Sequence, residues 1–166
     1  MPIDFTCPYC LEFDGRVREL VAEFQGQVQL VYKFFPLDGE CNPHLAENPA
    51  ATGCEAAASA YAAFKQNSFW EYSDLLFANF RQHTVEQLVS YGAAAGLADP
   101  EALGDATDDP AIYRRLARDV EEGFTAGVEG TPTIFVNGRL LDTSKLRAGD
   151  TRYGILKATV KELIRS

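Results

Sequence analysis

Four cysteines and one proline motif hold the residues of this 166-residue chain that could do chemistry. Cys7-Pro8-Tyr9-Cys10 is a C-x-x-C motif at the start of a stretch with helical periodicity. Gly130-Thr131-Pro132-Thr133 stands directly before a short apolar run. Thiol–disulfide exchange needs a thiolate, a disulfide sulfur and a second thiol that resolves the mixed disulfide. A C-x-x-C motif at a helix start supplies these parts, so the motif predicts dithiol–disulfide exchange.

The two cysteines of this motif are expected to have different roles. Cys7 precedes the first helical turn, where unpaired N–H groups and the helix dipole favour a thiolate. We therefore assign Cys7 as the exposed nucleophile and Cys10, one turn inside on the apolar face, as the buried resolving thiol. Pro8 is tolerated in a first helical turn and stiffens it. Tyr9 is expected to face solvent, and Pro8 and Tyr9 are candidate substrate contacts.

A zinc site is the alternative use of the cysteines. The four cysteines, Cys7, Cys10, Cys41 and Cys54, could form a four-ligand site, with His44 as a fifth possible donor. Cys41 and Cys54 are farther apart in sequence than the ligand pairs of a compact zinc knuckle, so redox chemistry is favoured. A structural disulfide is our first interpretation of Cys41 and Cys54, worth about 2–3 kcal/mol through restriction of the unfolded chain. A second redox pair and two free thiols are the other readings. His44 and His83 are expected at the surface.

The periodicity of the chain indicates β-α-β, then a block of helices, then β-β-α. Residues 2–5 and 27–35 are predicted parallel strands on either side of a helix that begins at Pro8. Residues 133–136 and 139–141 flank Asn137-Gly138, a strong hairpin signal. A final helix is predicted from about Asp150 to Ile164.

Capping signals mark where the helices of the central block begin. Ser68 with Glu71 and Thr84 with Gln87 both match the capping-box pattern, and two Asp-Pro pairs follow them. The helix after the second Asp-Pro pair has an apolar residue every four positions: Ile112, Leu116, Val120 and Phe124. An aromatic-rich helix is expected to pack the helical block on itself, and lining a peptide groove is the alternative for its rings: Phe69, Trp70, Tyr72, Phe77 and Phe80.

Charge and hydropathy argue against a nucleic-acid partner and against a membrane-spanning helix. The formal net charge is −9 and the sequence pI is about 4.7, whereas neutralising phosphates needs clustered Lys and Arg, so a nucleic-acid partner is not expected. No apolar run approaches the roughly 20 residues of a membrane-spanning helix. Cys7 lies too close to Met1 for a signal peptide to precede it in this chain.

The C-x-x-C unit, the helical block and the run from Gly127 to Gly138 together resemble the DsbA-like thiol–disulfide oxidoreductases of the thioredoxin superfamily. The resemblance covers essentially the whole chain. It implies a single α/β domain over 1–166 with a thioredoxin-like fold, β-α-β … β-β-α. Residues 1–37 and 127–166 would form the thioredoxin-like parts, and an all-helical insertion would span about 38–126. We expect the first strand to be truncated.

The resemblance also implies roles for the proline motif. In that family the proline that matches Pro132 is cis and faces the C-x-x-C motif, and the residue that matches Thr131 presents backbone groups to a bound peptide. The family transfers a disulfide, here Cys7–Cys10, to cysteines of protein substrates through a mixed disulfide on Cys7, with no organic cofactor or metal. We expect this chain to act as an oxidant. Because C-P-Y-C also occurs in glutaredoxins and some isomerases, a reductase or isomerase is an alternative, as is a non-catalytic zinc- or peptide-binding module.

Partners and location follow from the same resemblance. The residues from Phe35 to Ala57 are similar to those of DsbA-like domains fused to, or partnered with, vitamin K epoxide reductase homologues. A membrane redox partner of that type, or a DsbB-like one, would reoxidise the chain. The resemblance and the even cysteine count imply a periplasmic or otherwise extracytoplasmic bacterial location.

The chain departs from the family at one position before the nucleophile. Related proteins often carry a buried acidic residue six positions before it, where this chain has Met1. Asp4 lies three positions before Cys7, and we do not expect it to replace that residue.

Overall fold

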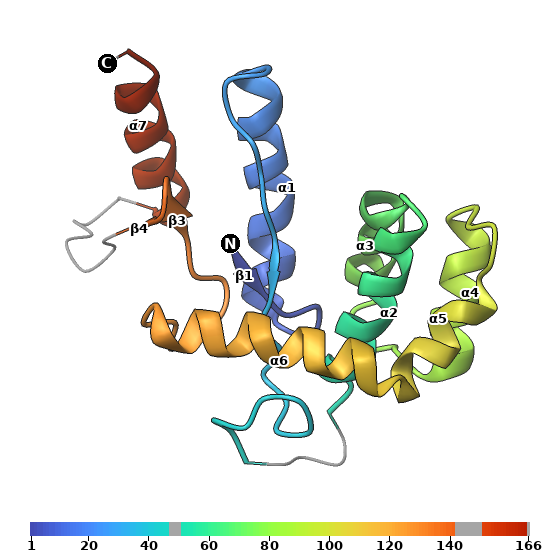
Figure 1. Cartoon of the computed structure of the whole chain (residues 1–166). Helices are drawn as coiled ribbons and strands as arrows, with labels where there is room; N and C mark the ends of the chain where they lie inside the picture. The colour runs from blue at the N-terminus through green and yellow to red at the C-terminus, as the bar shows by residue number, and fades with distance from the viewer. Residues whose placement is uncertain (47–50, 142–150, 166) are drawn as a thin grey trace.

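The structure is a computed structural model that describes residues 1–46, 51–141 and 151–165 (Figure 1). Its elements follow the predicted order, with helices between two pairs of short strands. They are β1 (Pro2–Ile3), α1 (Pro8–Glu23), β2 (Lys33–Phe34), α2 (Gly53–Lys65), α3 (Phe69–Ala78), α4 (Val85–Ala94), α5 (Glu101–Asp105), a 3-10 turn (Ala106–Asp108), α6 (Pro110–Thr125), β3 (Phe135–Val136), β4 (Arg139–Leu140) and α7 (Arg152–Arg165).

Strands β1 and β2 form the predicted parallel pair of the β-α-β unit. Pro2 pairs with Lys33 and Ile3 with Phe34. The strand predicted over 27–35 is wrong in length, because only Lys33–Phe34 is a strand. A strand requires a hydrogen-bonded neighbour, and β1 extends alongside only the last residues of the predicted segment. Among the described residues, the stretch before Lys33 has no strand partner.

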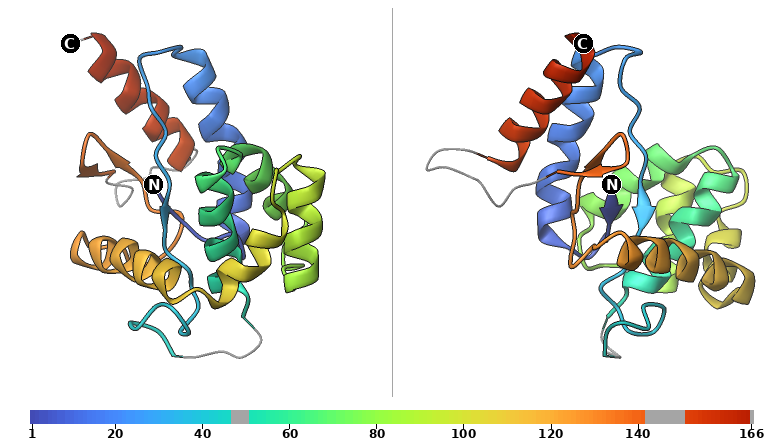
Figure 2. Two further views of the ribbon diagram at one scale, coloured as in Figure 1. Left: turned by 45° about the vertical axis from the view of Figure 1, so that its right-hand side comes forward. Right: turned by 60° about the vertical axis from the view of Figure 1, so that its left-hand side comes forward.

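Helix α1 packs against α7 through the apolar stripe that its sequence predicts. The cluster between these helices holds the buried side chains Phe13, Val17, Leu20, Ile134, Leu156 and Val160. The two helices lie side by side in both views of Figure 2. The final helix begins at Arg152 in the structure, and its predicted start at Asp150 lies outside the described residues.

The hairpin β3–β4 forms at the predicted turn. Asn137 and Gly138 have φ angles of 49° and 77°, the left-handed pair that a two-residue hairpin turn needs. Phe135 pairs with Leu140 and Val136 with Arg139 in antiparallel register. The hairpin lies next to α7 and follows the loop that carries Pro132 (Figure 1).

Helices α2 to α6 form a second layer around a larger cluster that includes Leu76, Leu88, Leu103 and Leu116. Helix α6 runs across the molecule from these helices toward the hairpin (Figure 1). It comes so close to the strand side that a Cβ on Gly123 would lie 2.8 Å from the Phe35 ring. The C-terminal end of α6 extends past this core, so Phe124, predicted on the apolar stripe, is 51% exposed.

Only one of the two predicted capping boxes is present. Thr84 and Gln87 exchange both hydrogen bonds at the start of α4. The prediction for Ser68 and Glu71 is wrong, because the Ser68 side chain makes no cap hydrogen bond. Ser68 has φ −121° and ψ 28°, whereas Thr84 is extended, and an extended cap residue is what lets the side-chain oxygen reach the N3 amide. No helix among the described residues has the length and hydropathy to span a membrane.

Candidate active site

The C-x-x-C motif occupies the N-terminus of α1. Cys7 is the extended N-cap residue, and Pro8 takes the first helical position, where no amide hydrogen bond is lost. The carbonyl of Cys7 accepts from the amides of Cys10 and Leu11 at 3.1 and 3.2 Å. Cys10 is fully buried on the core face of the helix, whereas Tyr9 is 65% exposed, as predicted.

The proline motif lies against the C-x-x-C motif. The Thr131–Pro132 peptide bond is cis, and both residues are buried. The Thr131 carbonyl accepts a hydrogen bond from Cys7 Sγ at 3.2 Å, although 124 positions separate the two residues in sequence. The loop before Pro132 is held by Thr133, whose hydroxyl donates to the Gly130 carbonyl at 2.5 Å. The fold therefore brings the two motifs into direct contact.

Cys7 is less accessible than predicted. Its side chain was expected to be exposed, but Cys7 is only 5% exposed. The reason is the contact with the Thr131 carbonyl, which places the sulfur under the proline loop rather than in open solvent.

The two thiols have opposite acidities. A hydrogen bond from Cys10 lowers the pKa of Cys7 from 9.0 to about 5, against the opposing effect of burial. Thr131 and the amides of Cys10 and Tyr9 lower it further. The same hydrogen bond and burial raise the pKa of Cys10 far above its usual value. Cys7 is thus the thiolate of the pair at neutral pH, and Cys10 holds the proton.

Asp4 is a buried residue in contact with Cys10. It is 2% exposed, and its amide donates to Cys10 Sγ at 3.5 Å. One carboxylate oxygen accepts from the amide and the hydroxyl of Thr6 at 2.6 and 2.7 Å, and the other accepts from the Leu37 amide at 2.6 Å. Asp4 therefore contacts Cys10 through its main-chain amide, and its carboxylate is hydrogen-bonded to Thr6 and Leu37 instead.

Cys41 and Cys54 form a disulfide with an S–S distance of 2.11 Å. This finding confirms the structural bridge and overturns the four-cysteine zinc alternative, because two of its ligands are consumed. His44, the proposed fifth donor, stacks on Phe124 with ring centroids 3.6 Å apart and lies 3.1 Å from the Glu121 carboxylate. The disulfide anchors the loop that contacts Asp4 through Leu37.

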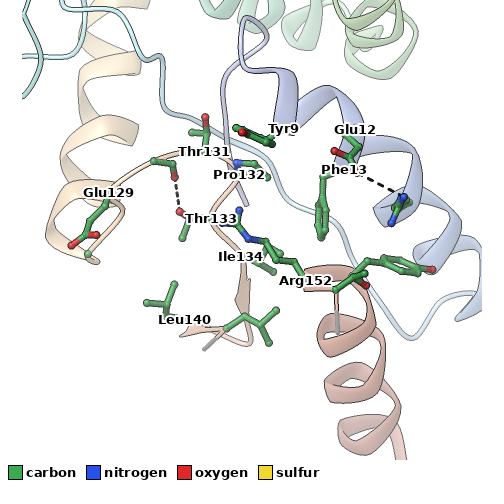
Figure 3. A pocket seen from close by; sticks show the side chains of 16 residues that line it. Tyr9, Glu12, Phe13, Glu129, Thr131, Pro132, Thr133, Ile134, Leu140 and Arg152 are labelled. Carbon is green, nitrogen blue, oxygen red and sulfur yellow. Dashed lines mark hydrogen bonds and ion pairs between the residues drawn. The ribbon is translucent and has the colours of Figure 1, made fainter. Parts of the chain in front are cut away.

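A surface groove of about 910 Å³ opens beside Pro132 (Figure 3). Its apolar wall is formed by Tyr9, Phe13, Ile134 and Leu140. Charged side chains lie at its margins: Glu12, Arg16, Glu129 and Arg152. The groove runs from the Cys7 end of α1 to the hairpin, and Phe13, Ile134 and Glu129 were not singled out in the sequence. Only the contact between distant segments reveals their shared position.

The aromatic residues of α3 do not line this groove in the described part of the chain. The prediction that they pack the helical block on itself is incomplete, because Phe69, Trp70 and Phe77 also pack on the β-α-β unit. Trp70 lies edge-on to Tyr32 with centroids 5.3 Å apart, and Phe77 lies 5.0 Å from Phe5. The parallel strands offer these rings an apolar face that the helical block by itself lacks.

The prediction that His83 lies at the surface is also wrong. His83 is 2% exposed, in the connection between α3 and α4. Its ring is held against α3 by a hydrogen bond to the main-chain carbonyl of Leu76, a contact that spacing along the sequence does not indicate.

Comparison with known proteins identifies the class. The family model described as Thioredoxin matches residues 3–149, so the chain belongs to this thioredoxin family. The structure of BdbD from Bacillus subtilis is similar over 98% of this chain and 84% of that chain, with a TM-score of 0.78 and 18% identity. Proteus mirabilis ScsC is similar over 98% and 80%, with a TM-score of 0.72 and 18% identity. The thioredoxin-like fold with a helical insertion is thereby confirmed.

Curated relatives match over a small part of their length. A protein named Na(+)/H(+) antiporter NhaA from Herminiimonas arsenicoxydans is 34% identical over 84% of this chain and 20% of its own length. NhaA 3 from Salinispora tropica is 35% identical over 82% of this chain and 19% of its own length. The chain therefore spans about a fifth of the length of the curated relatives that it matches.

Proposed function

We propose that the chain is a protein thiol–disulfide oxidoreductase of the Dsb type, with Cys7 and Cys10 as its redox pair. The observation that carries this proposal is the contact of the Cys7 sulfur, at the N-terminus of α1, with the Thr131 carbonyl beside cis-Pro132. In this arrangement an acidic thiol lies against Thr131, a residue that lines the groove, and a second thiol is fully buried.

The exchange balances without an organic cofactor or metal. A substrate thiolate attacks Cys7 Sγ, the Cys7–Cys10 bond breaks, and Cys10 leaves as a thiolate that takes up a proton. A second substrate thiolate then attacks the substrate sulfur of the mixed disulfide, and Cys7 leaves as a thiolate. Two electrons pass from the substrate dithiol to the cysteine pair.

The direction we propose is oxidation of the substrate. A thiol of low pKa is a good leaving group, and a stabilised thiolate favours the reduced form of the pair. The pKa of about 5 for Cys7 therefore makes its disulfide a better oxidant than one formed by thiols of ordinary acidity. Reductase and isomerase roles are the alternatives that a measured potential separates.

The substrates we propose are cysteine-containing polypeptides bound in the groove beside Pro132. Thr131 would offer its main-chain groups to the peptide as an added strand does, and the peptide would also contact Tyr9, which lines the groove, and the exposed Pro8 next to it. A membrane redox partner, DsbB-like or vitamin K epoxide reductase-like, would restore the disulfide. We propose an extracytoplasmic bacterial location, where the Cys41–Cys54 bridge would persist.

The test compares two variants, each of which replaces one cysteine of the proposed redox pair with serine. The Cys10→Ser variant, treated with an activated-disulfide peptide, should hold a long-lived mixed disulfide on Cys7, because no thiol remains to resolve it. The matched Cys7→Ser variant should hold none, since Cys10 is buried and holds its proton. Equal trapping by both variants, or trapping by neither, would exclude the proposed function.

Direction is measured on the wild-type protein by equilibration in glutathione buffers and counting of free thiols. A potential of about −120 mV, the value of a strong oxidant of this superfamily, would support oxidation of the substrate. A potential of about −270 mV, the value of a reductant of this superfamily, would assign a reductase.

A further inference from the structure

A second groove lies at the start of β1. It has a volume of about 550 Å³, and Met1 is one of the residues that line it. Helices α1 and α7 contribute Val17 and Leu156 to its lining, and residues 27–31 and the hairpin strand β3 contribute the rest of its walls. The N-terminus lies between the hairpin and the segment that leads into β2 in Figure 1 and in both views of Figure 2. The groove is therefore in line with β1, between two segments of the chain that could pair with a strand.

Main-chain groups on one side of the groove have no partner. The Lys33 amide donates to the Met1 carbonyl at 3.0 Å, and the Met1 α-ammonium donates to the Val31 carbonyl at 2.6 Å. Bonds in a parallel ladder are evenly spaced along alternate residues, so Gln29 and the Val31 amide face the continuation of β1. Neither amide has a main-chain partner among the described residues. An extended segment in the groove would supply carbonyl oxygens to both.

The hairpin offers unpaired main-chain groups on the other side. The Leu141 amide donates to the Ile134 carbonyl at 2.8 Å across the hairpin. Antiparallel ladders alternate between hydrogen-bonded and non-hydrogen-bonded pairs, so the pair of Phe135 with Leu140 is of the second kind. The main-chain groups of Phe135 therefore point away from β4, and Phe135 lines the groove. A segment in the groove could thus form hydrogen bonds on both of its edges.

The lining of the groove favours an uncharged, extended occupant. Within the described residues, every side chain that lines it is uncharged, although the chain has 24 acidic and 15 basic residues. Val28 and Leu30 pack against the apolar cluster between α1 and α7, whereas Gln29 and Val31 are exposed. This alternation matches a neighbouring strand that has apolar side chains at every second position.

The charged group at the groove is the α-ammonium of Met1. Burial lowers its pKa from 8.0 to about 6; Lys33 also lowers this pKa, and Asp119 raises it. A strand that continues the line of β1 in the same direction reaches Met1 with its C-terminal end. A carboxylate at that end would pair with the ammonium and offset the cost of burying it. A segment from the middle of a polypeptide has no carboxylate to place there.

We propose that this groove binds the apolar C-terminal segment of another polypeptide, as an added strand whose terminal carboxylate pairs with the Met1 ammonium. The strand runs parallel to residues 27–31 and bonds to main-chain groups of Gln29, Val31 and Phe135. The partner is recognised by alternating apolar side chains and by its free C-terminus. The interaction goes beyond the proposed function and uses neither thiol, so its test is independent of the thiol-trapping test.

Three synthetic peptides test the chemistry of the occupant. All have the same fluorophore and two N-terminal lysines for solubility. The first ends in Val-Thr-Val-Thr-Val with a free carboxylate, the second is its C-terminal amide, and the third ends in Val-Val-Val-Thr-Thr with a free carboxylate. Fluorescence anisotropy measures their binding to protein whose mass shows that Met1 is retained. The first should bind saturably and at least about tenfold more tightly than the others, which lack the ion pair or the alternation.

Two variants at one position test the main-chain contact. Gln29→Pro removes an amide that has no main-chain partner among the described residues, so it should weaken binding of the first peptide about fivefold or more. Gln29→Ala keeps this amide and should bind as wild type does. A third variant, with Val-Thr-Val-Thr-Val joined in front of Met1, should not bind the peptide, because its own chain fills the groove.

The outcomes that would overturn the proposal are distinct. Absence of saturable binding of the first peptide would exclude the groove as a docking site. Equal affinity for the amide would exclude recognition of a free C-terminus, and equal binding by the two Gln29 variants would place the peptide elsewhere. A dimer in sedimentation that dissociates as the first peptide is added would assign the groove to a second copy of this chain instead. Should Gln29→Pro fail to fold by circular dichroism, the comparison of the three peptides on wild type decides.

Discussion

At the scale of residues, the reactivity proposed for this chain depends on the groups that surround the sulfur of Cys7. Cys7 sits where helix amides, the Cys10 thiol and Thr131 all favour the thiolate, and these contacts outweigh the cost of burial. The Thr131 hydroxyl is buried without a hydrogen-bond partner among the described residues, next to both sulfurs. A hydroxyl so placed is available to a thiolate.

Replacing this hydroxyl should make Cys7 less acidic. Thr131→Val keeps the shape of the side chain but removes its polar atom, so the pKa of Cys7 should rise from about 5. The reaction of Cys7 with iodoacetamide, followed against pH, should therefore reach half its maximal rate near pH 5 in wild type and at a higher pH in the variant.

Thr133→Val is the matched control for this substitution. The Thr133 hydroxyl bonds to the Gly130 carbonyl rather than to a sulfur, so its loss should leave the half-maximal pH unchanged. Equal shifts in both variants would mean that loop geometry, and not the Thr131 hydroxyl, sets the acidity of Cys7.

At the scale of elements, hydrogen bonds that cap the helix starts stabilise the helices in addition to the packing of their apolar faces. Asp109 accepts from the Ala111 amide at 2.7 Å at the start of α6, and Thr84 caps α4 with Gln87. Helix α3 begins without a side-chain cap, although its sequence contains the same pattern. Its position instead depends on the aromatic contacts with the β-α-β unit.

This difference predicts unequal costs for two similar substitutions. Thr84→Ala should lower the free energy of unfolding by about 1 kcal/mol, because it removes a capping hydrogen bond. Ser68→Ala should change it by less than about 0.5 kcal/mol, since no cap hydrogen bond is lost. Urea unfolding at constant pH measures both, and an equal loss in the two variants would contradict the assignment of the caps.

At the scale of the whole molecule, the acidity of Cys7 links stability to pH. The folded-state pKa is lowered from 9.0 to about 5, so the reduced folded protein has lost a proton that the unfolded chain still binds between these values. Stability from this group is fully present above about 9, declines as pH falls, and is lost near pH 5. Only the reduced form has it, because disulfide sulfurs do not titrate.

The reduced protein should therefore gain stability over Cys7→Ser as pH rises from about 5 toward 9. Serine does not ionise in this range, so the difference between the two proteins isolates the thiolate. Thermal unfolding after mild reduction measures it, with a free-thiol count to verify that Cys41–Cys54 stays intact. A difference that stays constant over this interval would contradict the lowered pKa.

From the sequence alone, a redox motif and the order of the helices and strands could be predicted. A C-x-x-C motif at a helix start, Asn137-Gly138 between apolar runs, and Thr84 three residues before Gln87 are local patterns, and the structure has the helix, the hairpin and the capping box there. These three patterns could be predicted because they depend on neighbouring residues and on backbone angles that those residues favour, whereas the Ser68–Glu71 pattern failed where the backbone angles differ.

Other features could be seen only in the tertiary structure, because they depend on contacts between residues far apart in sequence. The burial of Cys7 under Thr131, the length of β2 beside a two-residue β1, and the enclosure of His83 each require a partner far away in sequence. Exposure, strand length and acidity are set by what packs against a residue, and spacing along the chain does not contain that information. For that reason the sequence pointed to Cys7 and Cys10 as a candidate redox pair, but only the fold showed what surrounds them.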